Sequence, residues 1–252
     1  MADDKKAAPA APKVESTAVI DYKAELAKMT VAVAEAEKPS GNWISFKGGV
    51  MAVAGNPIKG NKMPVIILHS VFENQLYAGK YDPNNQQPPI CYAFSDTDDD
   101  LKPHPDSAEP QNVDCATCPK NAWGSDPGGG KGKACKNVRR LGMIAASDLE
   151  NIAKAPVAIA KTPVTSVKNW STYASQIANV LKIPPIGVIT EMSVEPDAKT
   201  QFQVNFNLLD KVDEKYLPDL LNKRRETMPM MFAPYDKPAP QQDVAKAASN
   251  KY

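Results

Sequence analysis

The four cysteines of this 252-residue chain all lie between positions 91 and 135. Cys115 and Cys118 form a CxxC pair, in which one tight turn presents two thiolates to one ion. Cys91 and Cys135 flank this pair at distances that a loop can close. Tetrahedral Zn²⁺ takes four such soft ligands in structural sites and leaves no position open for catalysis. We therefore predict a structural zinc site with Cys91, Cys115, Cys118 and Cys135 as its ligands.

Other chemistry is open to the same residues. Disulfides need an oxidising compartment, whereas the N-terminal stretch MADDKKAAPAAPK lacks the apolar core of a signal peptide. An iron–sulfur cluster also accepts four thiolates and is the main chemical alternative, although the first spacing is wider than in the compact ferredoxin pattern. His104 could replace one cysteine as a ligand, but its position between Pro103 and Pro105 favours a solvated loop histidine.

Composition limits the class of protein. The chain is 42% hydrophobic and 23% charged, with a formal net charge of +1. Its longest apolar run, around Val65 to Leu68, is too short to span a bilayer, so we expect a soluble protein without a membrane partner. Charge is polarised around the cysteines. Residues 96–114 carry seven acids against one lysine, and residues 120–140 carry six bases against one aspartate.

Periodicity predicts mixed β and α structure between two tails. Residues 1–17 have the composition of a disordered tail, and residues 21–36 favour a short helix. Alternation and β-branched residues then predict strands, with a bend at Gly48-Gly49 and one long strand or a close pair between residues 63 and 81. The expected strands cover residues 42–47, 50–55, 63–81, 89–94, 137–146, 155–161, 186–195 and 201–209.

Helical spacing of apolar residues predicts an amphipathic helix over residues 166–183, stopped by Pro184-Pro185, with Trp170 in the core. A further helix is expected over residues 213–225, and a mobile tail from Pro229 onward. In the strand QFQVNFNLL, a period of two assigns the core face to Phe202, Val204, Phe206 and Leu208.

With the cysteine segment set aside, the element order is three strands, a helix and two strands. This is the order of an OB-fold, a five-stranded Greek-key barrel with a helix between its third and fourth strands. We therefore expect a mainly β chain with α-helices. Its domains would be a tail at 1–17, an OB-fold domain at 18–228 with a four-cysteine, zinc-ribbon-like insertion at 91–135, and a flexible tail at 229–252.

OB barrels bind single-stranded nucleic acid with cations for the phosphates and aromatic rings for unstacked bases. Both kinds of side chain occur near the cysteines, although any one aromatic residue could instead belong to the core. The sequence therefore predicts single-stranded DNA as the partner. The candidate contacts are Lys131, Lys133, Lys136, Arg139, Arg140, Trp43, Tyr77, Tyr81, Tyr92 and Trp123.

Five strings carry a resemblance to a known family: PICYAFSD, DCATCPKNAWGS, GKACKNVRRLGMIA, VKNWSTYA and VITEMSVEPD. Together they resemble single-stranded DNA-binding proteins of tailed bacteriophages, whose OB-fold carries a zinc-type cysteine insertion, over roughly residues 40–210. The resemblance implies a replication and recombination protein in the cytoplasm of the bacterial host. Such proteins typically end in an acidic tail that recruits partners, but the end of this chain, DKPAPQQDVAKAASNKY, is nearly neutral. Recruitment of replication proteins through that tail is therefore in doubt.

Two other functions remain open. One is a zinc-ribbon interaction module that docks on a polymerase or another replication or transcription protein through its polarised insertion. The other is a metal enzyme, but four thiolates close a zinc site, and His69 and His104 have no evident base or nucleophile beside them. We therefore expect no catalytic residues, no enzyme activity and no small-molecule substrate.

Overall fold

A computed structural model describes residues 22–23, 25–26, 28–30, 43–79 and 87–235. The chain divides into two compact units, residues 1–39 and 40–252. In the first unit the described residues between 22 and 30 have helical backbone, within the range expected for a helix. The tail predicted at 1–17, Tyr81 and residues 236–252 lie outside the described residues.

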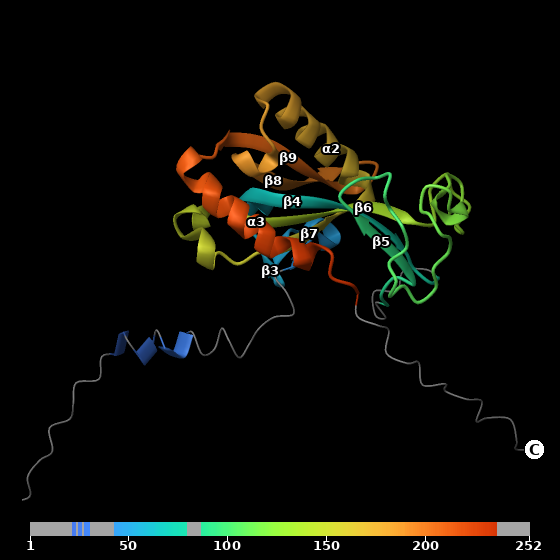
Figure 1. The fold of residues 1–252 in the computed structure, drawn as a ribbon, viewed down its shortest axis with the longest axis horizontal. Coiled ribbons are helices and arrows are strands. Elements are labelled where there is room, and N and C mark those ends of the chain that lie inside the picture. The colour runs from blue at the N-terminus through green and yellow to red at the C-terminus, as the bar shows by residue number, and fades with distance from the viewer. Residues whose placement is uncertain (1–21, 24, 27, 31–42, 80–86, 236–252) are drawn as a thin grey trace, which may run out of the picture. The chain divides into compact units, whose positions relative to one another are not determined.

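The second unit is mainly β, as predicted, with helices packed on its sheet. Figure 1 shows a strongly curved sheet with helices on both of its sides. Among the described residues nine strands form this sheet. They are β1 (Trp43–Ser45), β2 (Ala52–Val53), β3 (Asn56–Pro57), β4 (Lys62–Leu76), β5 (Cys91–Ser95), β6 (Lys136–Ala145), β7 (Ala158–Thr162), β8 (Val188–Asp197) and β9 (Gln201–Lys211).

Strand β4 organises the sheet because it is long enough to pair with three partners. The strand order is β3-β2-β1-β7-β6-β4-β8-β9, and β5 also pairs with β4. Strand β6 runs antiparallel along most of β4, with a register shift between Ile67 and His69. Strand β8 pairs with the first part of β4, and β5 pairs with its last part. The long bent strand predicted from residue 63 is thus confirmed.

The two ends of the sheet curl toward each other. Gly48 and Gly49 adopt positive φ angles of 62° and 76° in a turn after β1, which permits the sharp bend predicted there. A Cβ atom on Gly49 would lie 3.5 Å from Cβ of Phe202 in β9. The Asn61 side chain fixes the turn, because it donates to the Gly49 carbonyl (3.1 Å) and accepts from the Met51 amide (3.0 Å). The result is a curled mixed sheet with the shape of a half-barrel.

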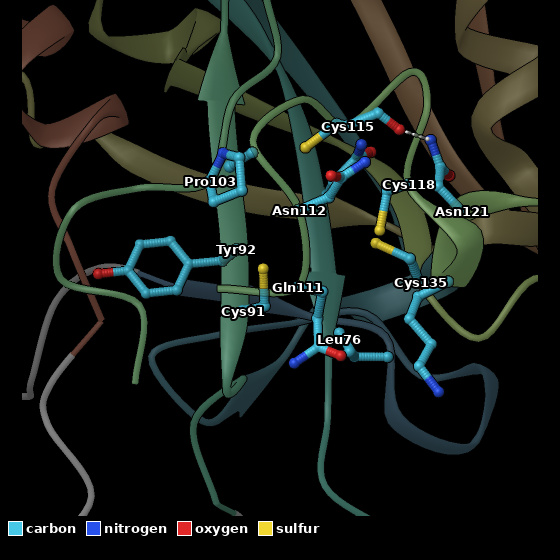
Figure 2. A pocket seen from close by; sticks show the side chains of 13 residues that line it. Leu76, Cys91, Tyr92, Pro103, Gln111, Asn112, Cys115, Cys118, Asn121 and Cys135 are labelled. Atoms are coloured by element: carbon cyan, nitrogen blue, oxygen red, sulfur yellow. Dashed lines mark hydrogen bonds between the residues drawn. The ribbon is translucent and has the colours of Figure 1, made fainter. Parts of the chain in front are cut away.

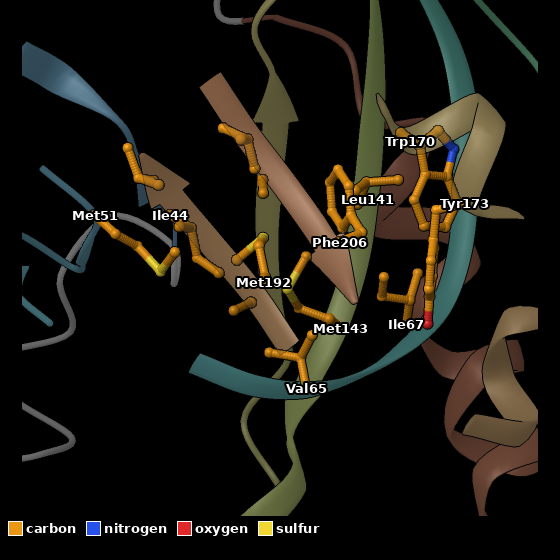
Figure 3. Packing of buried hydrophobic residues seen from close by; sticks show 14 of the residues in the cluster. Ile44, Met51, Val65, Ile67, Leu141, Met143, Trp170, Tyr173, Met192 and Phe206 are labelled. Atoms are coloured by element: carbon orange, nitrogen blue, oxygen red, sulfur yellow. The ribbon is translucent and has the colours of Figure 1, made fainter. Parts of the chain in front are cut away.

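Helix α2 (Val167–Gln176) packs against one side of the sheet and continues as a π-helical turn (Ile177–Leu181). Trp170 is 3% exposed and packs edge-on against Phe206, as predicted for a core residue. The hydroxyl of Tyr173 bonds to Oγ1 of Thr190 at 2.6 Å. Figure 3 shows these rings against the aliphatic side chains of β4, β6 and β8. Lys182 ends the turn in the left-handed region, two residues before Pro184.

The opposite side of β4 and β6 is covered by helix α3 (Leu217–Met231). Alternate residues of β4 supply the two cores, because Val65 and Ile67 join the α2 side while Ile66 and Leu68 pack with Leu220 of α3. A short 3₁₀ turn (Glu214–Tyr216) precedes α3, and its N-terminus is capped by Asp213, as expected for a helix that begins there. Among the described residues, no helix is long and apolar enough to cross a membrane.

Two predictions about this region were wrong. Leu208 is 43% exposed although its alternation with Val204 and Phe206 placed it on the core face. The register of β8 and β9 shifts between Ile189 and Thr190, the residue that pairs with Leu208, so the alternation is interrupted there. The flexible tail does not begin at Pro229, because α3 runs on to Met231 and the described chain remains packed as far as Tyr235.

Candidate metal pocket and nucleic-acid interface

All four cysteines predicted as ligands line one pocket (Figure 2). Cys91 begins β5, Cys115 and Cys118 lie in the loop that follows it, and Cys135 directly precedes β6. The four are free thiols, and all but Cys118 are buried. His104 is not part of the pocket lining, because it stacks on the Tyr92 ring with a centroid distance of 5.0 Å.

The thiols influence one another electrostatically. Burial raises the pKa of Cys115 to about 11 and that of Cys135 to about 12, and the charges of the neighbouring cysteines add to both shifts. A soft cation would reverse this effect, because it stabilises thiolates. Within the described ranges, no three Cys, His, Asp or Glu side chains are grouped closely enough to hold an ion as they now lie. The donor set nevertheless suits a thiophilic metal, since four thiols reach the same pocket.

We call residues 91–135 the cysteine lobe. The glycine-rich part of this lobe is organised around the Asp126 carboxylate. Oδ1 of Asp126 accepts from the Gly128 amide (3.0 Å), and Oδ2 pairs with Nζ of Lys136 (3.1 Å). A Cβ on Gly128 or Gly132 would lie 3.2–3.3 Å from these oxygens, so a larger residue there would press on the Asp126 carboxylate. These contacts hold the pKa of Asp126 below its usual range. The glycine-rich loop therefore binds the Asp126 carboxylate, and the Lys136 ammonium group is paired with that carboxylate.

The tip of the cysteine lobe presents an exposed aromatic residue beside a lysine. Trp123 is 80% exposed, and Nζ of Lys133 lies 5.3 Å from its ring centroid while donating to the Asn121 side chain. Lys131 is exposed nearby in the glycine-rich loop. Of the predicted contacts, Trp123, Lys131 and Lys133 are therefore brought together in one region of the surface.

Arg140, which the sequence predicted as a DNA contact, is buried and does not face solvent in the structure. Its guanidinium forms a bidentate ion pair with the Glu73 carboxylate of β4, with N···O distances of 3.0 and 3.1 Å. The Arg140 side chain is 3% exposed and the Glu73 side chain is 0% exposed. Burial alone would lower the pKa of Arg140, but the Glu73 charge and its hydrogen bonds outweigh burial and raise it. Neighbouring Arg139 is half-buried, and its Cζ lies over the Phe72 ring, 3.4 Å from the ring centroid.

The chain after α3 closes over this ion pair. Nη1 of Arg140 donates to the carbonyls of Met231 (3.1 Å) and Ala233 (3.3 Å). The Tyr235 hydroxyl donates to Glu73 and accepts from Nζ of Lys161 (3.1 Å). These contacts hold residues 231–235 on the sheet, which is why the predicted tail cannot begin at 229.

Aromatic rings surround the same ion pair. Trp43 is 37% exposed and lies 5.6 Å from the Arg140 guanidinium and 5.4 Å from Nζ of Lys161. The Tyr235 ring lies 4.8 Å from the same lysine nitrogen and stacks with Phe94. Burial is the main cause that lowers the pKa of Lys161. We call Trp43, Phe94, Arg140, Lys161 and Tyr235 the aromatic–cation face.

Tyr92 and Tyr77 lie close to this face but differ in exposure. Tyr92, which the sequence predicted as a base-stacking residue, is 3% exposed, and its ring contacts Phe94 and His104. Tyr77 is 41% exposed, and its hydroxyl donates to the Gln75 side chain. Burial of that hydroxyl, together with the nearby Glu73 charge, raises the pKa of Tyr77 to about 12.

Sequence reasoning missed two residues of the aromatic–cation face. Lys161 stands at the end of the predicted strand APVAIAK, where a lysine is normally solvated. Strict alternation would have placed it on the same face as Ile159, opposite to Ala160. Tyr235 lay in a stretch whose prolines and alanines favoured a tail, and no local signal identifies its partner Glu73, 162 residues earlier.

Comparison with known proteins adds no assignment. No family model matches the chain, and no curated protein or solved structure is significantly similar to it.

Proposed function

We propose that this chain binds single-stranded DNA without marked sequence preference and without catalysis, as a replication and recombination protein of a bacteriophage acting in the host cytoplasm. The observation that carries the proposal is the aromatic–cation face. Trp43 offers a partly exposed ring for a base, and Lys161 lies within 5.4 Å of that ring as a cation for the adjoining phosphate. Such pairs are what sequence-tolerant binding of single strands requires, at roughly 1–3 kcal/mol for each stacked base.

The strand order supports an OB-type barrel. Strands β4, β6 and β7 form a meander, α2 follows, and β8 and β9 complete the order β7-β6-β4-β8-β9. This matches an OB-fold in which the helix lies between the third and fourth strands and the second and third strands carry the binding face. Lys161 lies on the third of these strands, where it pairs in register with the buried Arg140 of the second.

We further propose that the cysteine lobe is held by a structural zinc ion bound to Cys91, Cys115, Cys118 and Cys135. Bound Zn²⁺ supplies no reaction chemistry at such a site and only ties the segments together, contributing about 10–16 kcal/mol of binding free energy. The protein's part is to present four thiols to one pocket at the end of β4, β5 and β6. The lobe would then hold Trp123, Lys131 and Lys133 as a second set of DNA contacts.

The proposal is tested by titrating a fluorescently labelled oligo(dT) with the full chain at several salt concentrations, with duplex DNA of equal length as the control. We expect binding that is tighter for the single strand and that weakens as salt rises, since phosphate contacts release counterions. Metal analysis of the same sample should give one zinc per chain. Absence of binding at low salt would overturn the proposed function, and iron in place of zinc would overturn the metal assignment.

The second candidate function is a zinc-ribbon module that docks on a replication protein. It is favoured by Trp123, which is 80% exposed on the cysteine lobe, because tryptophan is enriched at protein interfaces. Under this alternative, Trp43→Ala would leave all interactions of the protein intact, whereas Trp123→Ala would abolish partner binding.

A further inference from the structure

The hydroxyl of Tyr235 connects a buried carboxylate to the lysine of the aromatic–cation face. It contacts the Glu73 carboxylate on one side and Nζ of Lys161, at 3.1 Å, on the other. A carboxylate that is paired with a guanidinium only accepts hydrogen bonds, and an ammonium group only donates them. The directions are therefore determined: Lys161 donates to the Tyr235 oxygen, and the Tyr235 O–H donates to Glu73.

The carboxylate end of this chain of hydrogen bonds is held firmly. The Glu73 side chain is 0% exposed and is paired with both Nε and Nη2 of Arg140. The same guanidinium donates to the carbonyls of Met231 (3.1 Å) and Ala233 (3.3 Å), which hold the backbone that leads to Tyr235. The Tyr235 oxygen therefore has a defined place on the sheet.

The lysine end needs such an anchor. Lys161 is half-buried and pairs in register with Arg140, so two like charges lie opposite each other on neighbouring strands, an arrangement that is unfavourable. A lysine ammonium group also moves freely on its long, flexible stem. Tyr235 counters both effects, because its oxygen accepts one N–H of Lys161 and its ring lies 4.8 Å from Nζ.

The resulting position of the ammonium group suits a nucleotide. Nζ of Lys161 lies 5.4 Å from the centroid of the Trp43 ring, which is partly exposed. The hydrogen bond to Tyr235 uses one N–H of Lys161, and an ammonium group has further N–H donors that a phosphate oxygen can accept. A base on Trp43 and its adjoining phosphate can be bound together only if the separation of ring and cation is kept.

We propose that Tyr235 is a positioning residue for DNA binding, whose hydroxyl holds the Lys161 ammonium group beside Trp43 so that one nucleotide contacts both. This inference rests on the single-stranded DNA binding proposed above. Tyr235 acts through Lys161, and the segment after α3 thereby becomes part of the binding site.

The test is a double-mutant cycle in the full chain with Tyr235→Phe and Lys161→Met, read as the affinity for labelled oligo(dT). Tyr235→Phe keeps the ring and removes the hydroxyl, whereas Lys161→Met keeps an apolar stem and removes the N–H donors. We expect Tyr235→Phe to weaken binding about 2- to 10-fold, the range of one hydrogen bond. It should cause no further loss once Lys161 is Met, because the two residues act as one unit.

Tyr216→Phe is the matched control. The Tyr216 hydroxyl also donates to a glutamate, Glu150, and Nζ of Lys215 lies 4.6 Å from its ring, but Tyr216 stands in the 3₁₀ turn before α3 and outside the aromatic–cation face. Its affinity for oligo(dT) should equal that of the wild type. An equal loss from Tyr235→Phe with Lys or Met at position 161, or no loss at all, would overturn the inference, since a purely structural role does not depend on Lys161.

A second variant covers the case in which Tyr235→Phe does not fold. Tyr235→Gln supplies both a donor for Glu73 and an acceptor for Lys161, so Lys161→Met should weaken binding in this background as it does in the wild type. If Lys161→Met has no effect in Tyr235→Gln although it weakens the wild type, the inference is overturned. Wild-type protein that does not bind oligo(dT) would instead overturn the proposed function, so the two failures are distinct.

Discussion

Replacing Arg140 with alanine tests whether this residue belongs to the fold or to the DNA surface. In the structure its guanidinium is 3% exposed and pairs with Glu73, whose side chain is 0% exposed. The substitution would leave the Glu73 carboxylate with the hydroxyl of Tyr235 as its remaining direct partner. Removing one member of a buried pair typically costs about 3–5 kcal/mol, because the other charge stays buried and uncompensated.

A loss of this size would be a large part of the stability of a domain, which is about 5–15 kcal/mol. Urea unfolding followed by circular dichroism measures it directly. With a slope of about 2 kcal/mol per molar urea, a loss of about 4 kcal/mol lowers the midpoint by about 2 M. The matched control is Arg139→Ala, which removes a half-buried cation stacked on Phe72 and should cost only about 1 kcal/mol.

The double variant Glu73→Leu/Arg140→Met completes the test. Replacing both charges with apolar side chains removes the uncompensated carboxylate, so most of the lost stability should return. If Arg140→Ala costs no more than Arg139→Ala, or if the double variant is less stable than the single one, the ion pair does not stabilise the fold in this way.

Three further predictions concern α3, Tyr235 and the cysteine lobe. Gly142→Ala should destabilise the protein by about 1–3 kcal/mol in thermal unfolding, because its Cβ would lie 2.7 Å from Sδ of Met231; an unchanged midpoint would contradict the packing of α3 on β6. Burial and the Glu73 charge raise the pKa of Tyr235 above its usual range, so the folded state favours the neutral hydroxyl, and this stabilisation is complete below about pH 10 and declines at higher pH. Tyr235→Phe should therefore flatten the stability loss above about pH 10, and an identical pH profile would refute this. Cys118→Ser should lower zinc content and make residues 91–135 sensitive to protease, whereas full metal content with unchanged protection would argue against a structural metal.

Local sequence patterns predicted the helices and strands well, because each helix and strand has its own spacing of apolar residues. The alternation in QFQVNFNLL identified β9, and the apolar spacing around Trp170 identified α2. Cysteine spacing likewise predicted that the four thiols share one pocket, since a CxxC turn and two flanking loops restrict where the sulfurs can lie. The OB-type arrangement is a prediction that the strand order supports.

Such local patterns do not predict polar pairs between residues that are far apart in the sequence. Glu73 and Arg140 are 67 residues apart, and neither differs locally from a solvated charge. A sharper signal was present in β4, where Glu73, Asn74 and Gln75 stand at three successive positions of the central strand, and all three are buried. Polar residues at successive positions of a central strand indicate specific partners, which here are Arg140 for Glu73 and Asn137 for Asn74.

The most direct test of the central claim is an anisotropy titration of labelled oligo(dT) with wild type, Trp43→Ala and Lys161→Ala, each checked for folding by circular dichroism. We predict salt-dependent binding by the wild type. Trp43→Ala should bind about 5- to 150-fold more weakly, which corresponds to one stacked base, and Lys161→Ala should reduce the salt dependence by about one phosphate contact. Wild-type protein that leaves the oligonucleotide unbound at low salt, or folded variants that both bind as tightly as wild type, would contradict the claim.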